Sequence, residues 1–357
     1  MLEPATKEAL ANPRLFSRSE IVNVLGFFPD SPLNSLQIPE NAVTMTDPQQ
    51  PKTTEPKSSH TLKSAKARDD HLRVLPWLFL APALVIYTVI VVYPMVYSSY
   101  LSLFRWDGIS PTKIFVGLQN YVMLLTQNEV FWIALKNNAT WLAAALLLPT
   151  SIGLGFALVL NSKFRGSHIF RSIFYFPAVL SLAVVGLIWT WIYQPDLGLL
   201  NQALSASGLK FLTRNWLSDP QIALYPVIIA ATWNAVGLPM LLFLAGLQTV
   251  PEELLEAAKI DGAGPIRRFV HVTFPLLRET TLIVLAITAI NALKAYDIVY
   301  AMTNGGPANR TQLLSTWMYF LTYNYNTVGQ GTAIAVILFL ITLIFAIPYI
   351  RFMTRKA

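Results

Sequence analysis

The chain has 357 residues, of which 54% are hydrophobic and 13% are charged, about half the charged share of an ordinary soluble domain. Eighteen of its 45 charged side chains fall in residues 1–73, which leaves 27 for the other 284 residues. A soluble domain with so few charges would expose large apolar patches and aggregate. Residues 74–357 are therefore predicted to lie in a lipid bilayer, which excludes a purely soluble enzyme.

The chain has no cysteine, and this excludes a disulfide framework, a thiolate nucleophile and a cysteine-based metal site. Its formal net charge of +7 is compatible with nucleic-acid binding. Asymmetric loops of a membrane protein produce the same excess, so the charge by itself assigns no partner.

Residues 1–73 are rich in Pro, Ser, Thr, Asn and Gln, and no apolar run occurs from Met45 to Arg73. Such a segment cannot bury enough apolar surface to offset the entropy of ordering, so it is predicted to be a disordered cytoplasmic tail. Its one apolar patch, Ile21–Phe28, is too short for a signal peptide. One interpretation of the tail is a tether or regulatory arm. The other, which we favour, is either a lineage-specific extension or a start codon placed too early, with Met45 as the true start.

Six apolar stretches follow, each near the roughly 20 residues that a spanning helix needs. They are continuous rather than alternating, which favours helices over a barrel. The predicted spans are Val74–Ser98, Asn138–Leu160, Phe170–Tyr193, Ile222–Leu247, Leu282–Met302 and Thr332–Arg351. The predicted fold class is thus an all-α membrane protein with six transmembrane helices in one domain, residues 74–357.

Basic residues in the flanks of the spans predict the orientation, because they favour the cytoplasmic side. One side carries sixteen: Lys52, Lys57, Lys63, Lys66, Arg68, Arg73, Lys163, Arg165, Arg171, Lys259, Arg267, Arg268, Arg278, Arg351, Arg355 and Lys356. The loops on the other side carry five: Arg105, Lys113, Lys210, Arg214 and Arg310. Both termini are therefore predicted to be cytoplasmic in a plasma membrane, and the basic excess requires no nucleic acid.

Catalytic motifs are absent from the sequence. It contains no Gly-Lys dipeptide, so it has no phosphate-binding P-loop and is predicted not to hydrolyse ATP itself. The zinc-protease pattern H-E-x-x-H and the hydrolase pattern G-x-S-x-G are also missing. No catalytic residue, metal site or cofactor is predicted.

The loop between the fourth and fifth spans, Val250–Pro275, is longer and more detailed than an ordinary connector. Pro251 suits the first position of a short helix, and two glutamates follow it at the positive end of the helix dipole. Gly262 suits a left-handed residue after that helix, and Pro265 suits the start of a second one. Pro275 is predicted to end the second helix, so the loop forms two short helices around a corner.

This loop resembles the EAA loop of the membrane subunits of bacterial ABC importers. In that family Glu-Ala-Ala is followed after three residues by Gly, and after nine more by Ile-x-Leu-Pro. Here Glu256-Ala257-Ala258 is followed by Gly262 and then by Val272–Pro275, with the spacing intact and with Val and Phe replacing Ile and Leu.

Three further segments resemble the MalF-type sugar permeases of the carbohydrate branch. They are Phe115–Tyr121, Arg171–Pro177, and Gly305–Pro307 together with Thr311. The resemblance covers the chain from about Leu72 to its C-terminus and leaves the tail uncovered. Four matches in the same order make it specific.

The resemblance implies the membrane subunit of an ATP-driven importer for a sugar or polyol. Its implied partners are a second homologous permease subunit, a cytoplasmic ABC ATPase dimer and an external solute-binding protein, in the lipid bilayer. The EAA corner would fit a groove on the ATPase and transmit ATPase closure to the spans. The implied coupling residues are Glu256, Ala257, Ala258, Asp261, Gly262 and Pro275.

Candidate substrate-binding residues lie in the fifth predicted span, where Asn291, Lys294 and Asp297 recur at every third position along one helical stripe. Charges in a span usually face the bundle interior or a wet cavity. Lys294 matches no family pattern that we identify. The alternative is an ion pair between Lys294 and Asp297 near the outer interface, with Lys294 reaching toward water.

The fourth span adds Trp233 and Asn234, with Gly237 and Pro239 positioned to kink or unwind it. Together with Tyr296, these residues supply the planar polar groups and aromatic faces that bind sugars. MalF-type subunits are similar in holding their sugar between the equivalent helices.

Two other classes of function are weighed against the importer. A secondary transporter or channel would usually need buried titratable groups as ion relays, and only Lys294 and Asp297 qualify. It would also leave the EAA loop unexplained. A membrane-embedded enzyme lacks a catalytic constellation.

Overall fold

The computed structural model describes residues 77–162 and 166–354. The predicted tail, residues 1–73, lies outside these ranges. The described part of the chain is mostly helical, with one two-stranded antiparallel sheet in which Phe104 pairs with Phe115.

Within residues 77–162 and 166–354, three helices are long and apolar enough to cross a membrane, and they confirm the first, second and sixth predicted spans. The first runs over Trp77–Leu101 and ends in α4 (Tyr93–Leu101), after the π-helical turn η3 (Thr88–Val92). The second, α6 (Glu129–Asn161), begins nine residues before the predicted start. The sixth, α18, covers Val328–Thr354.

The third predicted span is not the continuous helix that we expected. It consists of α7 (Ser167–Val179) and α8 (Leu182–Ile192), which meet at an angle of 100°. The break follows Pro177 by a few residues, and the Ser181 side chain accepts a hydrogen bond from the Val184 N–H to begin the new helix. The predicted span is therefore present as a bent pair of helices rather than as one helix.

The fourth predicted span bends by 42° between α10 (Leu224–Ala235) and α11 (Gly237–Gln248). The bend confirms the expectation that the Gly237 region kinks this span. A side chain at Gly237 would come within 3.0 Å of the Tyr175 Cα atom, so glycine also permits α11 to approach α7 closely.

The fifth predicted span, Leu282–Met302, is also interrupted. Helix α15 (Arg278–Leu293) ends well before the predicted limit, and α16 (Asp297–Thr303) begins after three non-helical residues. The backbone freed by this break is bonded elsewhere, because the Ser315 hydroxyl donates to the Ala295 carbonyl oxygen. A spanning helix can break inside the membrane only where the freed backbone groups find such partners. The pattern of apolar residues in the sequence does not reveal these partners.

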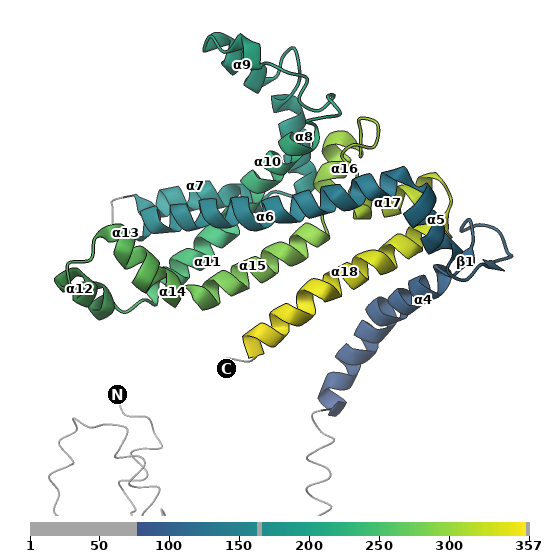
Figure 1. Cartoon of the computed structure of the whole chain (residues 1–357), viewed down its shortest axis with the longest axis horizontal. Helices are drawn as coiled ribbons and strands as arrows, with labels where there is room; N and C mark the ends of the chain where they lie inside the picture. The colour runs from purple at the N-terminus through teal and green to yellow at the C-terminus, as the bar shows by residue number, and fades with distance from the viewer. Residues whose placement is uncertain (1–76, 163–165, 355–357) are drawn as a thin grey trace, which may run out of the picture. The chain divides into compact units, whose positions relative to one another are not determined.

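Helix α6 is the central element of the bundle. It contributes to three successive apolar core clusters along its length. In chain order its residues in these clusters are Phe131 and Ala134, then Trp141 and Leu142, and then Ala157 and Leu160. Helices α7, α11 and α15 lie along it (Figure 1). At one end of α6, here called the corner end, lie α12 (Glu252–Ile260), α13 (Pro265–Arg268) and α14 (Phe274–Leu276).

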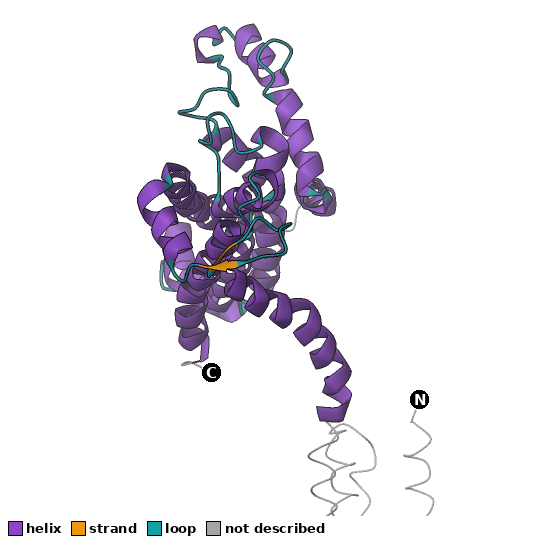
Figure 2. Ribbon diagram, turned by 90° about the vertical axis from the view of Figure 1, so that its right-hand side faces the viewer, coloured by secondary structure: helices purple, strands orange, loops and turns teal. Residues whose placement is uncertain are grey.

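The opposite end of α6, here called the strand end, carries β1 (Phe104–Arg105), β2 (Ile114–Phe115) and α5 (Gln119–Gln127). Figure 2 shows the strand pair beside the end of α4. Helix α17 (Leu314–Tyr319) and its π-helical extension η6 (Phe320–Asn324) also lie here. Helix α9 (Leu199–Ala206) lies beyond α8 and away from the strand end (Figure 1), in contact with the 3-10 turn η4 (Lys210–Leu212).

The hairpin at the strand end is held by Asp107, which accepts hydrogen bonds from the Ser110 hydroxyl and from the N–H groups of Ser110 and Ile109. These bonds lower the pKa of Asp107 to about 2. The bonds therefore stabilise the hairpin fully at pH values above the ordinary carboxyl pKa. This stabilisation is lost as the pH falls from there through about 2.

Helix α6 approaches α11 closely at Gly153, where an added Cβ would lie 2.8 Å from the Met240 backbone nitrogen. The same atom at Gly155, half a turn away, would meet nothing within 4 Å. We expect Gly153→Ala to lower the free energy of unfolding by about 1–3 kcal/mol, because the backbone of α11 cannot yield. Gly155→Ala should be neutral or stabilising by up to about 1 kcal/mol.

Thermal unfolding of the two purified variants in one detergent measures this difference. Equal midpoints for Gly153→Ala and Gly155→Ala would show that the close helix contact does not limit stability.

Candidate functional site: an exposed corner and a cavity at the helix breaks

The corner begins with α12, whose first turn carries Glu252 and Glu253 at the positive end of the helix dipole. Pro251 has an extended backbone and is the N-cap residue rather than the first helical residue that we predicted. The extended conformation suits a proline that cannot donate to the preceding turn.

A Schellman motif ends α12 and confirms the predicted left-handed glycine. Gly262 has a φ of 78°. Its N–H donates to the Lys259 carbonyl (3.1 Å), and the Ala263 N–H donates to the carbonyl of Ala258 (2.9 Å). The second alanine of the EAA motif thus anchors the corner, and Asp261 is its C-cap residue. Two short helices around a corner are confirmed by α13, which starts at Pro265.

The end of the second helix differs slightly from the prediction. Pro275 lies inside α14, and the helix ends one residue later, before a bend of 68° into α15. A π-helical turn, η5 (Phe269–Thr273), precedes it, and the Phe274 N–H donates to the Phe269 carbonyl. The wider turn accommodates the missing N–H of Pro275, so the proline does not stop the helix at its own position.

The corner is highly exposed, since α12 buries none of its residues. Glu256, Ala257 and Asp261 are exposed, while Ala258 is half-buried. Ile260 and Ile266 are 85% and 79% exposed on either side of the Gly262 turn. Apolar side chains so exposed on a rigid turn are typical of a surface that another protein covers.

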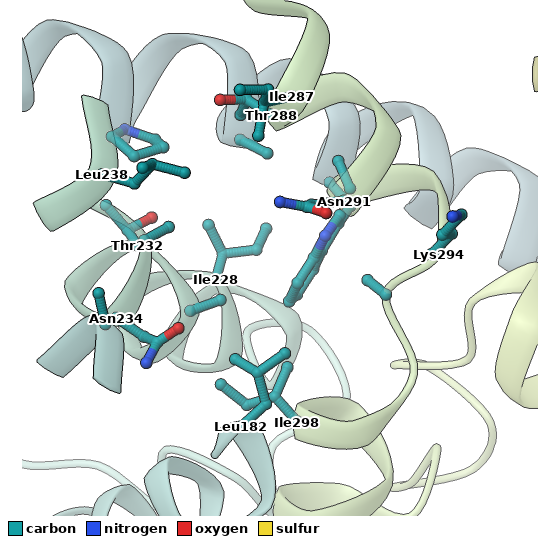
Figure 3. A pocket seen from close by; sticks show the side chains of 18 of the residues that line it. Leu182, Ile228, Thr232, Asn234, Leu238, Ile287, Thr288, Asn291, Lys294 and Ile298 are labelled. Carbon is teal, nitrogen blue, oxygen red and sulfur yellow. The ribbon is translucent and has the colours of Figure 1, made fainter. Parts of the chain in front are cut away.

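A second feature is a cavity of about 450 Å³ near the middle of the bundle. It is bounded by α6, α10, α11, α15 and α16, with the α7–α8 break at its wall (Figure 3). Its polar lining consists of Thr232, Asn234, Thr288, Asn291, Lys294, Tyr296 and Asp297. Trp141, Ile228 and Leu238 are among its apolar residues.

Five of the six predicted substrate-binding residues line this cavity: Asn234, Asn291, Lys294, Tyr296 and Asp297. Trp233 is not among its lining residues. The Trp233 ring instead packs edge-on against Trp189, with the ring centroids 5.9 Å apart. No sequence pattern points to Trp141, Thr232 or Ile287, whereas Thr288 continues the three-residue spacing one step before Asn291.

The three residues expected on one helical stripe do not share a helix. Asn291 lies in α15, Lys294 is the C-cap residue of that helix, and Asp297 is the first residue of α16. A cation is stabilised at the negative C-terminal end of a helix and an anion at the positive N-terminal end. The two charges therefore match the two helix ends that the break creates.

The ion pair considered above is not formed. Among the described residues, no ion pair or hydrogen bond joins Lys294 to Asp297, and both side chains are exposed. Figure 3 shows the Asn291 amide extending into the cavity and Lys294 at its edge. Within the same ranges, no protein group hydrogen-bonds to the Asn291 side chain, which leaves it available to a ligand.

Asn234 has a structural task as well. Its Nδ2 atom donates to the carbonyl oxygens of Pro177 and Leu180, at the end of α7 where the helix breaks. Carbonyl groups at a helix end have no intrahelical partner, and this amide satisfies two of them. Only the Asn234 Oδ1 atom remains for the cavity.

No group of three His, Cys, Asp or Glu side chains that could hold a metal ion occurs in residues 77–162 and 166–354. The chemistry of the cavity is that of hydroxyl, amide and charged groups beside aromatic rings. It can bind a polar, uncharged or zwitterionic molecule, and it contains no arrangement for covalent catalysis.

The broken spans, the cavity at their breaks and the exposed corner are the features of a membrane transport subunit. Residues 149–355 match the family of binding-protein-dependent transport system inner membrane components, and the chain belongs to this family. It is thus a permease subunit of an ABC transporter rather than a catalytic enzyme.

Named relatives agree with this assignment. The chain is 38% identical to the probable ABC transporter permease protein YurN of Bacillus subtilis over 78% of its own length and 96% of that protein. It is 35% identical to the trehalose/maltose transport system permease protein MalF of Thermococcus litoralis, over 78% and 92% of the two chains.

A solved structure shares the fold. It is a chain of a bacterial ABC transporter involved in the import of the acidic polysaccharide alginate, with a TM-score of 0.69 and 22% identity. The similarity covers 82% of this chain and 99% of that one.

Proposed function

We propose that this chain forms half of the translocation pathway of an ATP-driven, binding-protein-dependent sugar importer. The observation that carries the proposal is the course of α15. This helix starts at Arg278, directly after the exposed corner, and ends at Leu293, where the break lines the cavity. A rigid helix about 24 Å long thus joins a surface suited to an ATPase to a site suited to a substrate.

The partners follow from the corner and from the family. Two cytoplasmic ATPases supply the hydrolysis that this chain lacks, and one of them receives the corner in a groove. Glu256 is exposed for pairing with a basic group there. A second, homologous permease completes the pathway, and an external solute-binding protein delivers the substrate, as the family description implies.

A sugar or related polyol is the substrate class that the cavity fits best. Free amide and hydroxyl groups such as Asn291 and Thr288 can bond sugar hydroxyls, and Trp141 and Tyr296 offer aromatic faces. Relatives are named for trehalose and maltose transport and for sulfoquinovosyl glycerol transport. The substrate of this chain is drawn from the same class.

The test is reconstitution of the chain with its cognate permease, ATPase and binding protein in lipid vesicles. Uptake of radiolabelled maltose or trehalose should require ATP on the side of the membrane that carries the ATPase. It should also require the binding protein on the opposite side. Uptake driven by an ion gradient without the ATPase would instead support the secondary transporter.

We infer that the corner end lies in the cytoplasm and the strand end outside, with both termini cytoplasmic. Lys136, which lies in α6 near the strand end, raises the number of basic residues on that side to six. Sixteen remain on the other side. The excess on the corner side still favours this orientation.

We therefore expect reporter fusions at Gln202 and Asn309 to be active outside the cell and a fusion at Gly264 to be active in the cytoplasm. Paired phosphatase and fluorescent-protein reporters at each position measure this. An external Gly264 would overturn the orientation and, with it, docking of the corner on an ATPase.

A further inference from the structure

Four tyrosines form a continuous series of ring contacts that starts at the cavity. Tyr296 lines the cavity, and its ring lies 5.3 Å from the rings of both Tyr300 and Tyr319, centroid to centroid. Tyr300 also contacts Tyr319 at 5.5 Å, and Tyr319 contacts Tyr323 at 4.9 Å. We call Tyr296, Tyr300, Tyr319 and Tyr323 the tyrosine path.

The path becomes more exposed with distance from the cavity. Tyr296 and Tyr319 are half-buried, whereas Tyr300 is 40% exposed and Tyr323 is 69% exposed. The path uses α16 and the α17–η6 segment, which come from opposite sides of the loop around Gly305. A tertiary contact, rather than one helix face, therefore brings these rings together.

The exposed end of the path lies toward the strand end of the bundle. The segment that follows Tyr323 bonds to the hairpin there, since the Gly329 N–H donates to the Trp106 carbonyl at 3.4 Å. In the proposed orientation this is the external side. The tyrosine path thus joins the external surface to the cavity.

Tyrosine rings suit a weak, moving interaction with sugars. Each ring offers an apolar face and a hydroxyl group, so it can stack on the C–H face of a pyranose and also bond its hydroxyls. Because neighbouring ring centroids are 4.9–5.5 Å apart, a sugar that leaves one ring contacts the next. No single ring encloses it, so none would trap it.

We propose that the tyrosine path binds pyranose rings in succession and leads them between the external surface and the cavity. This inference rests on the proposed function and on the proposed orientation. The other role for such exposed rings is packing against the second permease subunit, and the experiment below separates the two.

The experiment uses the complete importer in lipid vesicles with saturating binding protein, assayed for uptake of radiolabelled maltose, trehalose and maltotriose. The variants are Tyr300→Leu, Tyr323→Leu and Tyr323→Phe. Tyr325→Leu is the matched control, because Tyr325 is 55% exposed two residues further on and contacts Trp317 instead of the path. Copurification of the partner subunits is measured for every variant.

We expect each path leucine variant to assemble normally and to lower the initial uptake rate by about fivefold, the effect of losing one aromatic contact. Tyr323→Phe, which keeps the ring but loses the hydroxyl, should lower the rate less than Tyr323→Leu does, and Tyr325→Leu should retain the wild-type rate. Maltotriose, which spans more rings than maltose, should be affected more strongly.

Unchanged uptake in both leucine variants, or a loss in Tyr323→Phe equal to that in Tyr323→Leu, would overturn the path. Failure of the leucine variants to copurify with the second permease would also overturn it, in favour of subunit packing. If the unaltered importer takes up none of the three sugars while its variants assemble, the proposed substrate class fails, and the path fails with it.

Discussion

Replacing Gly262 by valine should reduce ATP-driven uptake by at least about tenfold while leaving the chain folded in the membrane. The left-handed backbone at Gly262 costs a residue with a Cβ atom roughly 1 kcal/mol or more, and a β-branched residue most of all. The least costly way to relieve this strain is to break the Schellman hydrogen bonds to the Lys259 and Ala258 carbonyls. Their loss changes the orientation of α12 relative to α13. ATP hydrolysis should then proceed without transport.

The chain provides a matched control at Gly208, in the segment between α8 and α10. Gly208 has the same φ of 78°, and a side chain at either glycine would meet nothing within 4 Å. Gly208→Val therefore introduces the same backbone strain far from the corner and should leave coupling intact. Gly262→Asn should be mild, because asparagine tolerates the left-handed region.

Uptake and ATP hydrolysis are measured on the same vesicles, with assembly checked by copurification. Normal uptake by Gly262→Val would remove the role assigned to the corner. An equal loss in Gly208→Val would show that strain, wherever it lies, explains the effect.

The second large effect is expected at the cavity. Asn291→Ala should lower sugar uptake by about tenfold with little change in stability, because the amide lies in the cavity and bonds to no described protein group. Asp297→Asn and Lys294→Met should shift substrate preference as well as rate, since each removes one charge from the break. Asn161→Ala, at the exposed end of α6, is the control.

Asn234→Ala should behave differently from Asn291→Ala. It leaves the carbonyls of Pro177 and Leu180 without their donor, so it should destabilise the α7 break by about 1–3 kcal/mol. Thermal unfolding in detergent, compared with uptake, separates the two asparagines. Unchanged uptake and substrate preference in Asn291→Ala, Asp297→Asn and Lys294→Met together would show that the cavity is not the substrate site.

The sequence by itself determined the number of apolar spans, the corner and its left-handed glycine. Each of these depends on local chemistry: the length of an apolar run is set by bilayer thickness, and Gly262 follows a short helix at the position where only glycine is unstrained. The same information predicted that Asn291, Lys294 and Asp297 lie together, because charged and amide groups in a span are rare enough to stand out, and the three residues line one cavity.

Only the tertiary structure decided where the spans break. Breaks are suggested in the sequence by Pro177, Ser181 and Gly237. An apolar run, however, has the same composition and length whether it forms one helix or two. The break at residues 294–296 depends on Ser315, which lies twenty residues away in sequence and bonds the freed Ala295 carbonyl. That contact turns a predicted stripe of one helix into two charged helix ends facing a cavity. Other tertiary contacts decide that Asn234 caps α7 and that Trp233 packs against Trp189 instead of facing the cavity, since neither partner is local in sequence.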